Sequence, residues 1–355
     1  MFKFNAGAQH PATGDARLAA ANDLVSRTLA QHGLMPGGSS TPQANWTMPQ
    51  MPKMPSMTGL AGLAGMAGAG TVAHTMTPGT YTGATGHRDY LVHVPASAAD
   101  GATGLVVMLH GCTQNPADFA AGTGMNALAD RDGFIVLYPQ QSRGDNAQSC
   151  WNWFSRGDQL RDKGEPAIIA GMTRQIAEQH GISADRTFVA GLSAGAAMAV
   201  ILGQTYGDVF SAVGAHSGLP YSAARDVPSA FAAMGGQGAD VAAPTGPGIP
   251  TIVFHGTADS TVNPVNGQRI AAHALTGAAQ TIETEANGTT NGRGWHLRSA
   301  ADMQGREMLE YWTVDGLGHA WSGGQPGGSY TDARGPDASA EMVRFFFDNA
   351  GKAQQ

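Results

Sequence analysis

The sequence predicts an α/β protein with a mainly parallel sheet and helices on both faces of that sheet. From about residue 80 onward, short apolar runs alternate with stretches of helical length, which is typical of a parallel sheet with helical crossovers. One apolar run, Thr187–Ala190, leads directly into Gly191–Gly195 and then into a helix-forming stretch. That strand-turn-helix order places a serine, Ser193, at the end of a strand.

The other elements follow from the same alternation. Strands are expected where four to eight mostly apolar residues occur together, and helices where longer stretches begin near Pro, Asp or Asn and contain few glycines. The expected strands are 104–109, 134–138, 187–190, 210–214, 251–254 and 307–314. The expected helices are 117–130, 165–180, 194–206, 263–275 and 336–349.

The segment around Ser193 has the pattern of a nucleophile elbow, Gly-x-Ser-x-Gly. A serine hydroxyl is a weak nucleophile, so it must be presented on a sharp turn that a base and a carbonyl group can both reach. Gly191 and Gly195 leave room for that turn, and the helix that begins at Ala194 directs its positive end toward developing negative charge. The pattern alone is weak in a chain with 50 glycines.

An acid and a histidine are expected further along, each in a loop after a strand. Asp259 follows the apolar run 251–254, and His319 follows the run 307–314. His319 would take the proton of Ser193, and Asp259 would orient the imidazole. Asp315 is a rival acid, but it precedes His319 too closely in the chain to face it across a site.

Two backbone donors are expected to form an oxyanion hole. One is the N–H of Ala194, directly after the serine, and the other is the N–H of Cys112, in the loop after the run 104–109. Neither a metal nor an organic cofactor is required by this chemistry, and we expect none.

Each of these residues also has an ordinary structural interpretation. The serine pattern can arise by chance, His319 can be a plain core or surface histidine, and Asp259 can cap the helix expected from residue 263. Four features in the required order favour the catalytic interpretation. We interpret His110, His216 and His255, which lie at other strand ends, as packing or hydrogen-bonding groups.

The composition argues against nucleic acid as a partner. Only 13% of the residues are charged, against a typical value of about 25%, and the formal net charge is -7. A neutral or apolar substrate suits such a surface better than a polyanion does.

The first 79 residues differ from the rest, and the chain divides into four segments. We expect residues 1–34 to contain a short amphipathic helix over Asp15–His32, and residues 35–79 to form a Met-, Pro-, Gly- and Ala-rich linker. In this linker Met48–Met57 repeats every three residues, so it is either a plain linker or a methionine stripe that adheres to an apolar surface. The catalytic domain is expected at 80–350 and a short tail at 351–355, with no transmembrane segment.

The two cysteines leave the redox state and the location open. A bridge between Cys112 and Cys150 would tie the oxyanion loop to an aromatic segment and indicate an extracellular protein, whereas free thiols would fit the cytoplasm. The start of the chain shows no apolar signal-peptide core, so the location remains undecided between these two. The sequence says nothing about the oligomeric state.

Several motifs together resemble the poly(3-hydroxybutyrate) depolymerase family of esterases over about residues 81–350. They are His110–Gln114, Cys150–Phe154, Gly164–Pro166 with Ile168–Gly171, Ala190–Gly195, His216–Pro220, Gly318–Gly324 and Arg334–Ser339. The resemblance implies an α/β-hydrolase fold and a serine esterase, a carboxylic ester hydrolase, with Ser193, Asp259 and His319 in the triad positions. It also implies extracellular polyester degradation, although no separate substrate-binding domain is recognisable here.

The expected substrate is a short-chain polyester or oligoester of the poly(3-hydroxybutyrate) type. Trp151, Trp153 and Trp321 lie in segments that should border the triad and could hold an ester-rich chain by apolar contact, although filling the core is expected for at least one of them. One alternative is an esterase of the feruloyl or acetylxylan type. Another is a non-catalytic protein that binds the surface of polymer granules.

Overall fold

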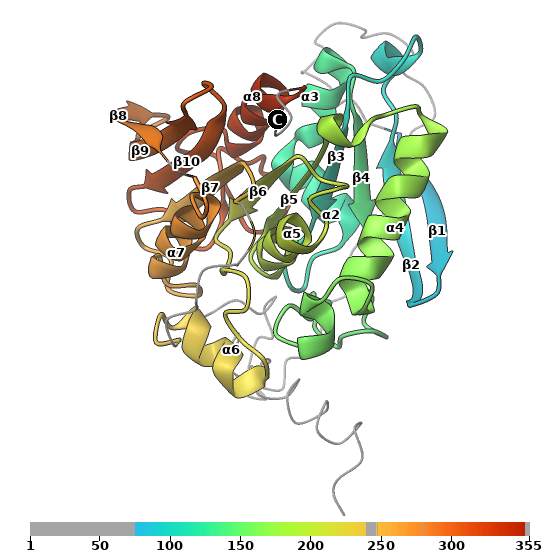
Figure 1. The fold of residues 1–355 in the computed structure, drawn as a ribbon, viewed down its shortest axis with the longest axis horizontal. Coiled ribbons are helices and arrows are strands. Elements are labelled where there is room, and N and C mark those ends of the chain that lie inside the picture. The colour runs from blue at the N-terminus through green and yellow to red at the C-terminus, as the bar shows by residue number, and fades with distance from the viewer. Residues whose placement is uncertain (1–74, 239–245, 247, 279, 352–355) are drawn as a thin grey trace, which may run out of the picture.

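The computed structural model describes residues 75–238, 246, 248–278 and 280–351. The expected amphipathic helix in Asp15–His32 and the Met- and Pro-rich stretch Met48–Met57 lie outside these residues. Within the described part, a ten-stranded sheet has the order β1-β2-β4-β3-β5-β6-β7-β10-β9-β8 (Figure 1). Its strands are β1 Thr77–Gly83, β2 Gly86–His93, β3 Leu105–Leu109, β4 Ile135–Pro139, β5 Thr187–Leu192, β6 Ala212–His216, β7 Thr251–Gly256, β8 Thr281–Thr290, β9 Arg293–Asp302 and β10 Glu307–Val314.

The six central strands, from β4 to β10, run parallel to one another, whereas both outer pairs are antiparallel. A short parallel pair, β11 Trp321–Ser322 and β12 Thr331–Asp332, lies outside the main sheet. The expected mainly parallel sheet is thus confirmed. Because parallel strands direct their carboxyl ends to one edge, the loops after β3, β5, β7 and β10 meet there.

Helices cover both faces of the sheet, and each face has its own core. One core joins the sheet to α4, α5 and α7, and the other joins it to α2, α3 and α8. The helices are α2 Pro116–Thr123, α3 Met125–Asp132, α4 Gly164–Gln179, α5 Ala194–Thr205, α6 Val227–Met234, α7 Val265–Ala274 and α8 Ala338–Asn349, with 3₁₀ turns η1 Ala96–Ala98, η2 Arg156–Gln159 and η3 Ala184–Arg186.

Several expected boundaries differ from the structure, among them the strand expected at 210–214, which is Ala212–His216, and a cause is visible for two of the helices. The single helix expected over 117–130 is broken at Gly124, whose φ of 64° ends α2 in the left-handed conformation before α3 begins. Helix α8 begins after Asp337, whose side chain accepts a hydrogen bond from the Ala340 N–H, and not at Pro336. Helix α7 likewise begins at Val265 and not at residue 263.

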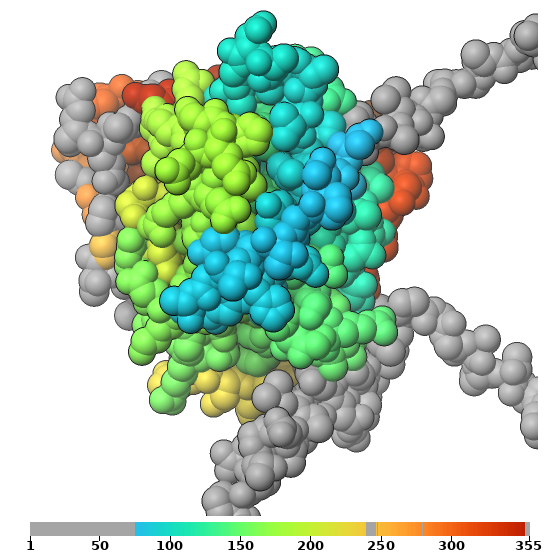
Figure 2. All heavy atoms as spheres, turned by 90° about the vertical axis from the view of Figure 1, so that its right-hand side faces the viewer, coloured from blue at the N-terminus to red at the C-terminus, as the bar shows by residue number. Residues whose placement is uncertain are grey.

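Two hairpins and one helix were not expected from the sequence. The β8–β9 hairpin turns through Asn291 and Gly292, both with positive φ, and Asn-Gly is a strong turn signal that could have revealed it. The β1–β2 hairpin lies at the opposite end of the sheet and is exposed beside α4, as Figure 2 shows. Helix α6 lies below the edge where the strands end (Figure 1), and its Ala230 and Ala233 belong to the core that contains residues of α4, α5 and α7.

Candidate active site

Ser193 has the backbone geometry that a nucleophile elbow requires. It lies between β5 and α5 with φ 58° and ψ −119°, a conformation that is costly for a residue with a side chain. The turn is held by the Ser193 N–H, which donates to the His216 carbonyl oxygen at 2.9 Å. A Cβ atom at Gly195 would collide with the backbone oxygens of Leu109 and His110, so this position accepts only glycine.

His319 and Asp259 come together from two loops. The His319 Nδ1–H donates to Asp259 Oδ2 at 2.8 Å, and the Asp259 side chain is completely buried. The other carboxylate oxygen of Asp259 accepts hydrogen bonds from the N–H groups of Thr261 at 3.0 Å and Val262 at 2.9 Å. Asp259 thus orders its own loop and does not cap α7.

The charge on Asp259 follows from these contacts. Burial alone would raise its pKa, but the hydrogen bond and charge of His319, together with the Val262 N–H and His255, outweigh burial and lower the pKa to about 2. The carboxylate is therefore ionised at neutral pH. An ionised acid holds the His319 ring with its proton on Nδ1 and leaves Nε2 free to accept one.

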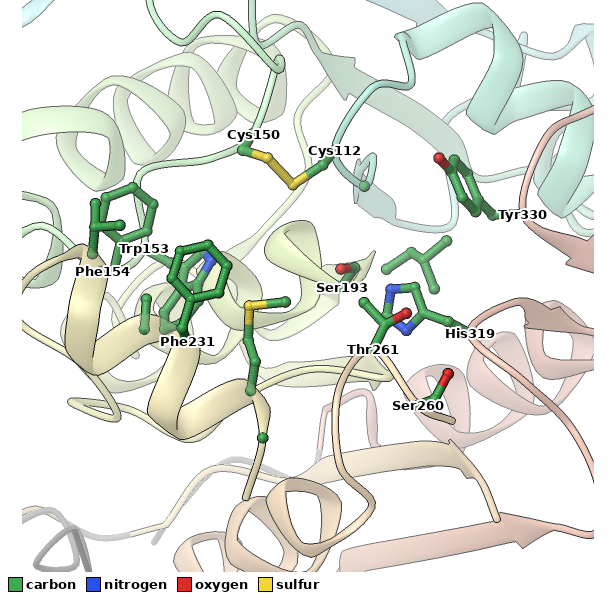
Figure 3. Close-up of a pocket in the computed structure, with 16 residues that line it drawn as sticks. Cys112, Cys150, Trp153, Phe154, Ser193, Phe231, Ser260, Thr261, His319 and Tyr330 are labelled. Carbon is green, nitrogen blue, oxygen red and sulfur yellow. A yellow bond between two sulfur atoms is a disulfide. The ribbon is translucent and has the colours of Figure 1, made fainter. Parts of the chain in front are cut away.

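Ser193 and His319 line one pocket, and Figure 3 shows the imidazole beside the serine hydroxyl. In the described part of the chain no hydrogen bond joins Ser193 Oγ to His319. Such contacts are often long in ligand-free enzymes and shorten when substrate binds. The pocket contains both groups that an acyl transfer needs.

The loop after β3 carries Cys112 to the same pocket and is held in several ways. Cys112 forms a disulfide with Cys150, with the Cα atoms 4.2 Å apart, so of the two alternatives left open by the sequence the structure has the bridge. Gln114 Oε1 accepts the Gly111 N–H at 2.9 Å, and the Thr113 hydroxyl lies 2.9 Å from the Tyr330 hydroxyl. In the described part of the chain, the Cys112 N–H donates to no protein acceptor.

Ala194, the other expected donor, is the first residue of α5 and is buried. At a helix start the first N–H groups have no partner within the helix. Its position next to Ser193 is the one that an oxyanion donor needs.

Among the three expected tryptophans, the structure brings only Trp153 to the pocket. Trp151 and Trp321 are fully buried, so the expectation that they border the substrate is wrong for these two. The indole N–H of Trp151 donates to the His110 carbonyl oxygen at 3.1 Å, and that of Trp321 donates to Ser339 Oγ at 3.0 Å. Both are core residues that support the loops.

Sequence reasoning missed several residues that line the pocket. They come mostly from α6 and from the loop after Asp259, and they are Val227, Ala230, Phe231, Met234, Ser260, Thr261 and Tyr330. The apolar members of α6 recur at helical spacing, which is a weak signal in a short stretch.

The three other strand-end histidines are buried hydrogen-bonding groups. His110 Nε2 accepts the Gln141 N–H at 3.1 Å, and His216 Nε2 accepts the Ser322 N–H at 3.0 Å. Burial lowers the pKa of His110 to about 4 and that of His216 to about 3, so both rings are neutral. His216 stacks on Trp321 and thereby supports the segment after His319.

No helix in the described part of the chain is long and apolar enough to cross a membrane. Within the same residues, no three His, Cys, Asp or Glu side chains cluster in a way that could hold a metal ion.

Comparison with known proteins identifies relatives of this chain. It is 34% identical to poly(3-hydroxyalkanoate) depolymerase C of Paucimonas lemoignei over 247 residues, which cover 66% of this chain and 58% of that protein. It is 28% identical to a probable acetylxylan esterase A of Aspergillus flavus over 193 residues, covering 49% of this chain and 62% of that protein. The chain thus spans about three fifths of the length of these two relatives.

A solved structure of an acetyl xylan esterase from Aspergillus awamori shares the fold. The TM-score is 0.59 at 19% identity, over 76% of this chain and 98% of the other. The fold is therefore of the α/β-hydrolase type. The model of the family described as esterase PHB depolymerase matches residues 88–293, more than half of the sequence. This chain belongs to the esterase PHB depolymerase family.

Proposed function

We propose that the protein is a serine esterase that hydrolyses short-chain polyester or oligoester bonds of the poly(3-hydroxybutyrate) type. The observation that carries the proposal is the pairing of a strained Ser193 with the His319–Asp259 hydrogen bond at one pocket. The depolymerase named among the relatives supports the substrate class.

In the proposed reaction, Ser193 Oγ attacks the ester carbonyl carbon while His319 Nε2 takes the hydroxyl proton. The carbonyl oxygen becomes an oxyanion, which accepts hydrogen bonds from the N–H groups of Cys112 and Ala194. The tetrahedral intermediate then expels the alcohol, which receives the proton from His319. An acyl group remains bound to Ser193.

Water completes the cycle by the same steps. His319 removes a proton from water, the hydroxide attacks the acyl carbonyl, and the acid leaves as Ser193 recovers its proton. Asp259 stays ionised throughout and stabilises the imidazolium form of His319. We assign this chemistry to a single catalytic unit spanning residues 80–350.

The test is product analysis after incubation of the full chain with amorphous poly(3-hydroxybutyrate), beside the Ser193→Ala variant. We expect soluble hydroxybutyrate monomers and oligomers from the natural protein and none above background from the variant. Ser193→Ala should retain the natural unfolding transition. Comparable product from both proteins would overturn the assignment, and binding of polymer without cleavage by either would favour the granule-binding alternative.

A second candidate is an acetylxylan-type esterase. The similarity to a probable acetylxylan esterase A favours it, because the same triad would serve both reactions. A panel of acetate, ferulate and hydroxybutyrate esters separates the two. A higher kcat/KM for acetylated xylan than for hydroxybutyrate oligomers would replace the polyester proposal.

A further inference from the structure

Helix α6 forms one wall of the pocket with a single apolar face. Val227, Ala230, Phe231 and Met234 follow the spacing i, i+3, i+4, i+7, and all four line the pocket. Residues at this spacing share one side of a helix. Helix α6 lies beyond the sheet edge (Figure 1), and its Ala230 and Ala233 also belong to the core that contains residues of α4, α5 and α7.

The rest of the lining near α6 is also apolar. It includes Trp153 and Phe154, whose rings meet edge to face with centroids 5.7 Å apart and lie toward the same end of the pocket as Phe231 (Figure 3), together with the Cys112–Cys150 disulfide. Among the residues that the structure describes, no Asp, Glu, Lys or Arg lines the pocket. We call this space, bounded by α6, Trp153, Phe154 and the disulfide, the apolar arm.

The polar lining lies on the other side of Ser193. Figure 3 shows His319, Ser260, Thr261 and Tyr330 toward one end, and Trp153, Phe154 and Phe231 toward the other. In a serine esterase the leaving alcohol must lie beside the histidine that protonates it. The acyl chain, attached to the other side of the same carbonyl carbon, then extends away from His319.

We propose that the apolar arm binds the acyl part of the ester and makes the protein prefer uncharged, linear acyl chains of butyryl to hexanoyl length over acetyl. The inference rests on the proposed triad. A charged acyl group is disfavoured, because burying an ion without a partner is costly. The alcohol part lies at the polar end, near Ser260, Thr261 and Tyr330.

Chain length gives the expected size of the effect. Each additional methylene group that is fully buried in the arm should raise kcat/KM by up to about fourfold, and a methylene group that stays partly exposed should raise it by less. The substrates are nitrophenyl acetate, butyrate and hexanoate, which share a leaving group and differ only in the acyl chain. We expect kcat/KM to rise from acetate to butyrate and to hexanoate.

The decisive variant is Ala230→Phe, which fills the arm from the buried face of α6. It should lower the hexanoate-to-acetate ratio of kcat/KM by roughly tenfold, since the longer chain loses most of its apolar contact. The matched control is Ala232→Phe, the same substitution on the same helix at a residue that does not line the pocket. Its ratio should equal that of the natural protein.

Met234→Gln is a second variant with little change in volume. It places a polar amide in the arm and should lower the same ratio, so the proposal stays testable if Ala230→Phe does not fold. Equal rates for the three esters, or equal ratios in Ala230→Phe, Met234→Gln and Ala232→Phe, would overturn the acyl assignment. That outcome differs from failure of the proposed function, in which none of the three esters is hydrolysed or Ser193→Ala hydrolyses them as fast as the natural protein.

Discussion

The imidazole of His255 lies against Asp259, with its Nε2 atom 3.5 Å from the Oδ2 atom that also accepts the His319 hydrogen bond. The same His255 Nε2–H donates to the Val262 carbonyl oxygen at 2.8 Å, and the Val262 N–H donates to Asp259 Oδ1. His255 thereby holds the loop that carries the acid. The ring is completely buried, which lowers its pKa and keeps it neutral.

Replacing His255 with Phe should therefore destabilise the protein. The Val262 carbonyl loses its donor in a buried position, which costs about 1–3 kcal/mol in the free energy of unfolding. Urea denaturation at pH 7 measures this change. The exposed His180 provides the control, because its side chain makes no hydrogen bond within the described part of the chain, so His180→Phe should change stability little. Equal losses in the two variants would refute the role assigned to His255.

Asp259→Asn tests how far activity depends on the ionised acid. The amide cannot hold the His319 proton on Nδ1 as a carboxylate does, and kcat should fall by roughly 10⁴-fold, the size of effect known for such a change in another serine hydrolase. Steady-state kinetics on a nitrophenyl ester measure it. A loss of less than tenfold would mean that another group orients His319.

Asp259 also contributes to stability, with a sign set by its lowered pKa. A carboxyl whose pKa is about 2 when folded stabilises the protein above the ordinary pKa of about 3.9 and loses this contribution as pH falls toward 2. The Asn variant should lack that part of the acid dependence.

The buried His110 makes the stability of the protein depend on pH in a second range, which lies above the range set by Asp259. Its pKa is about 4 in the folded state, chiefly because of burial, against about 6.5 when unfolded, so the unfolded chain binds the extra proton between these values. Stability should fall as pH falls from about 6.5 to 4, by about 1.4 kcal/mol per pH unit for this group. In His110→Gln, denaturation at several pH values should show a slope smaller by that amount.

The Cys112–Cys150 disulfide should stabilise the protein because it closes a loop and so reduces the conformational entropy of the unfolded chain. The cysteines are 38 residues apart, and in a chain-entropy model a loop of this length contributes about 4 kcal/mol. Cys112→Ser combined with Cys150→Ser should lower the urea midpoint accordingly. The natural protein under reductant should shift in the same direction, and coincident midpoints with and without the bridge would contradict this account.

The activity of the variant with both Cys112→Ser and Cys150→Ser tests the role of the backbone N–H at position 112. The Cys112 N–H survives the substitution, so loss of activity would come from movement of the loop. The Gly111–Gln114 and Thr113–Tyr330 contacts still hold that loop. We therefore expect kcat to fall by less than the roughly 10²–10³-fold typical of a deleted oxyanion donor.

The parts of the site that follow strands were predictable from the sequence. Ser193 comes directly after β5, and Asp259 and His319 lie in the loops that follow β7 and β10. Parallel strands bring such loops to one edge. The β8–β9 hairpin was not recognised because β8 is mostly polar and exposed, although Trp295 and Leu297 alternate along β9 and Asn291 and Gly292 mark the turn.

Helix α6 and the tryptophans show where sequence reasoning is insufficient. Nothing local distinguishes an apolar helix face that covers a sheet from one that lines a pocket, so α6 was missed. Trp151 and Trp153 are only two residues apart and both are buried in the same core, yet only Trp153 also lines the pocket. Tertiary packing alone decides between them.

Alanine substitutions of Trp153 and Trp321 can be compared to distinguish a role in substrate binding from a role in packing. Trp321 contacts Phe119 edge to face and stacks on His216, with ring centroids 5.5 and 5.0 Å away. Trp321→Ala should lower the free energy of unfolding by about 3–5 kcal/mol, as for other buried aromatic residues. Thermal unfolding measures this loss.

Trp153→Ala should instead change substrate binding selectively, because the ring lines the apolar arm. We expect KM for a hydroxybutyrate oligomer to rise more than KM for nitrophenyl acetate, whose acyl chain is too short to reach deep into the arm. The kinetics should be measured well below the unfolding temperatures of the natural protein and of Trp153→Ala, so that differences in stability do not affect the comparison. Equal increases for the two substrates would place Trp153 with Trp321 as a packing residue, since a general loosening of the pocket does not depend on acyl length.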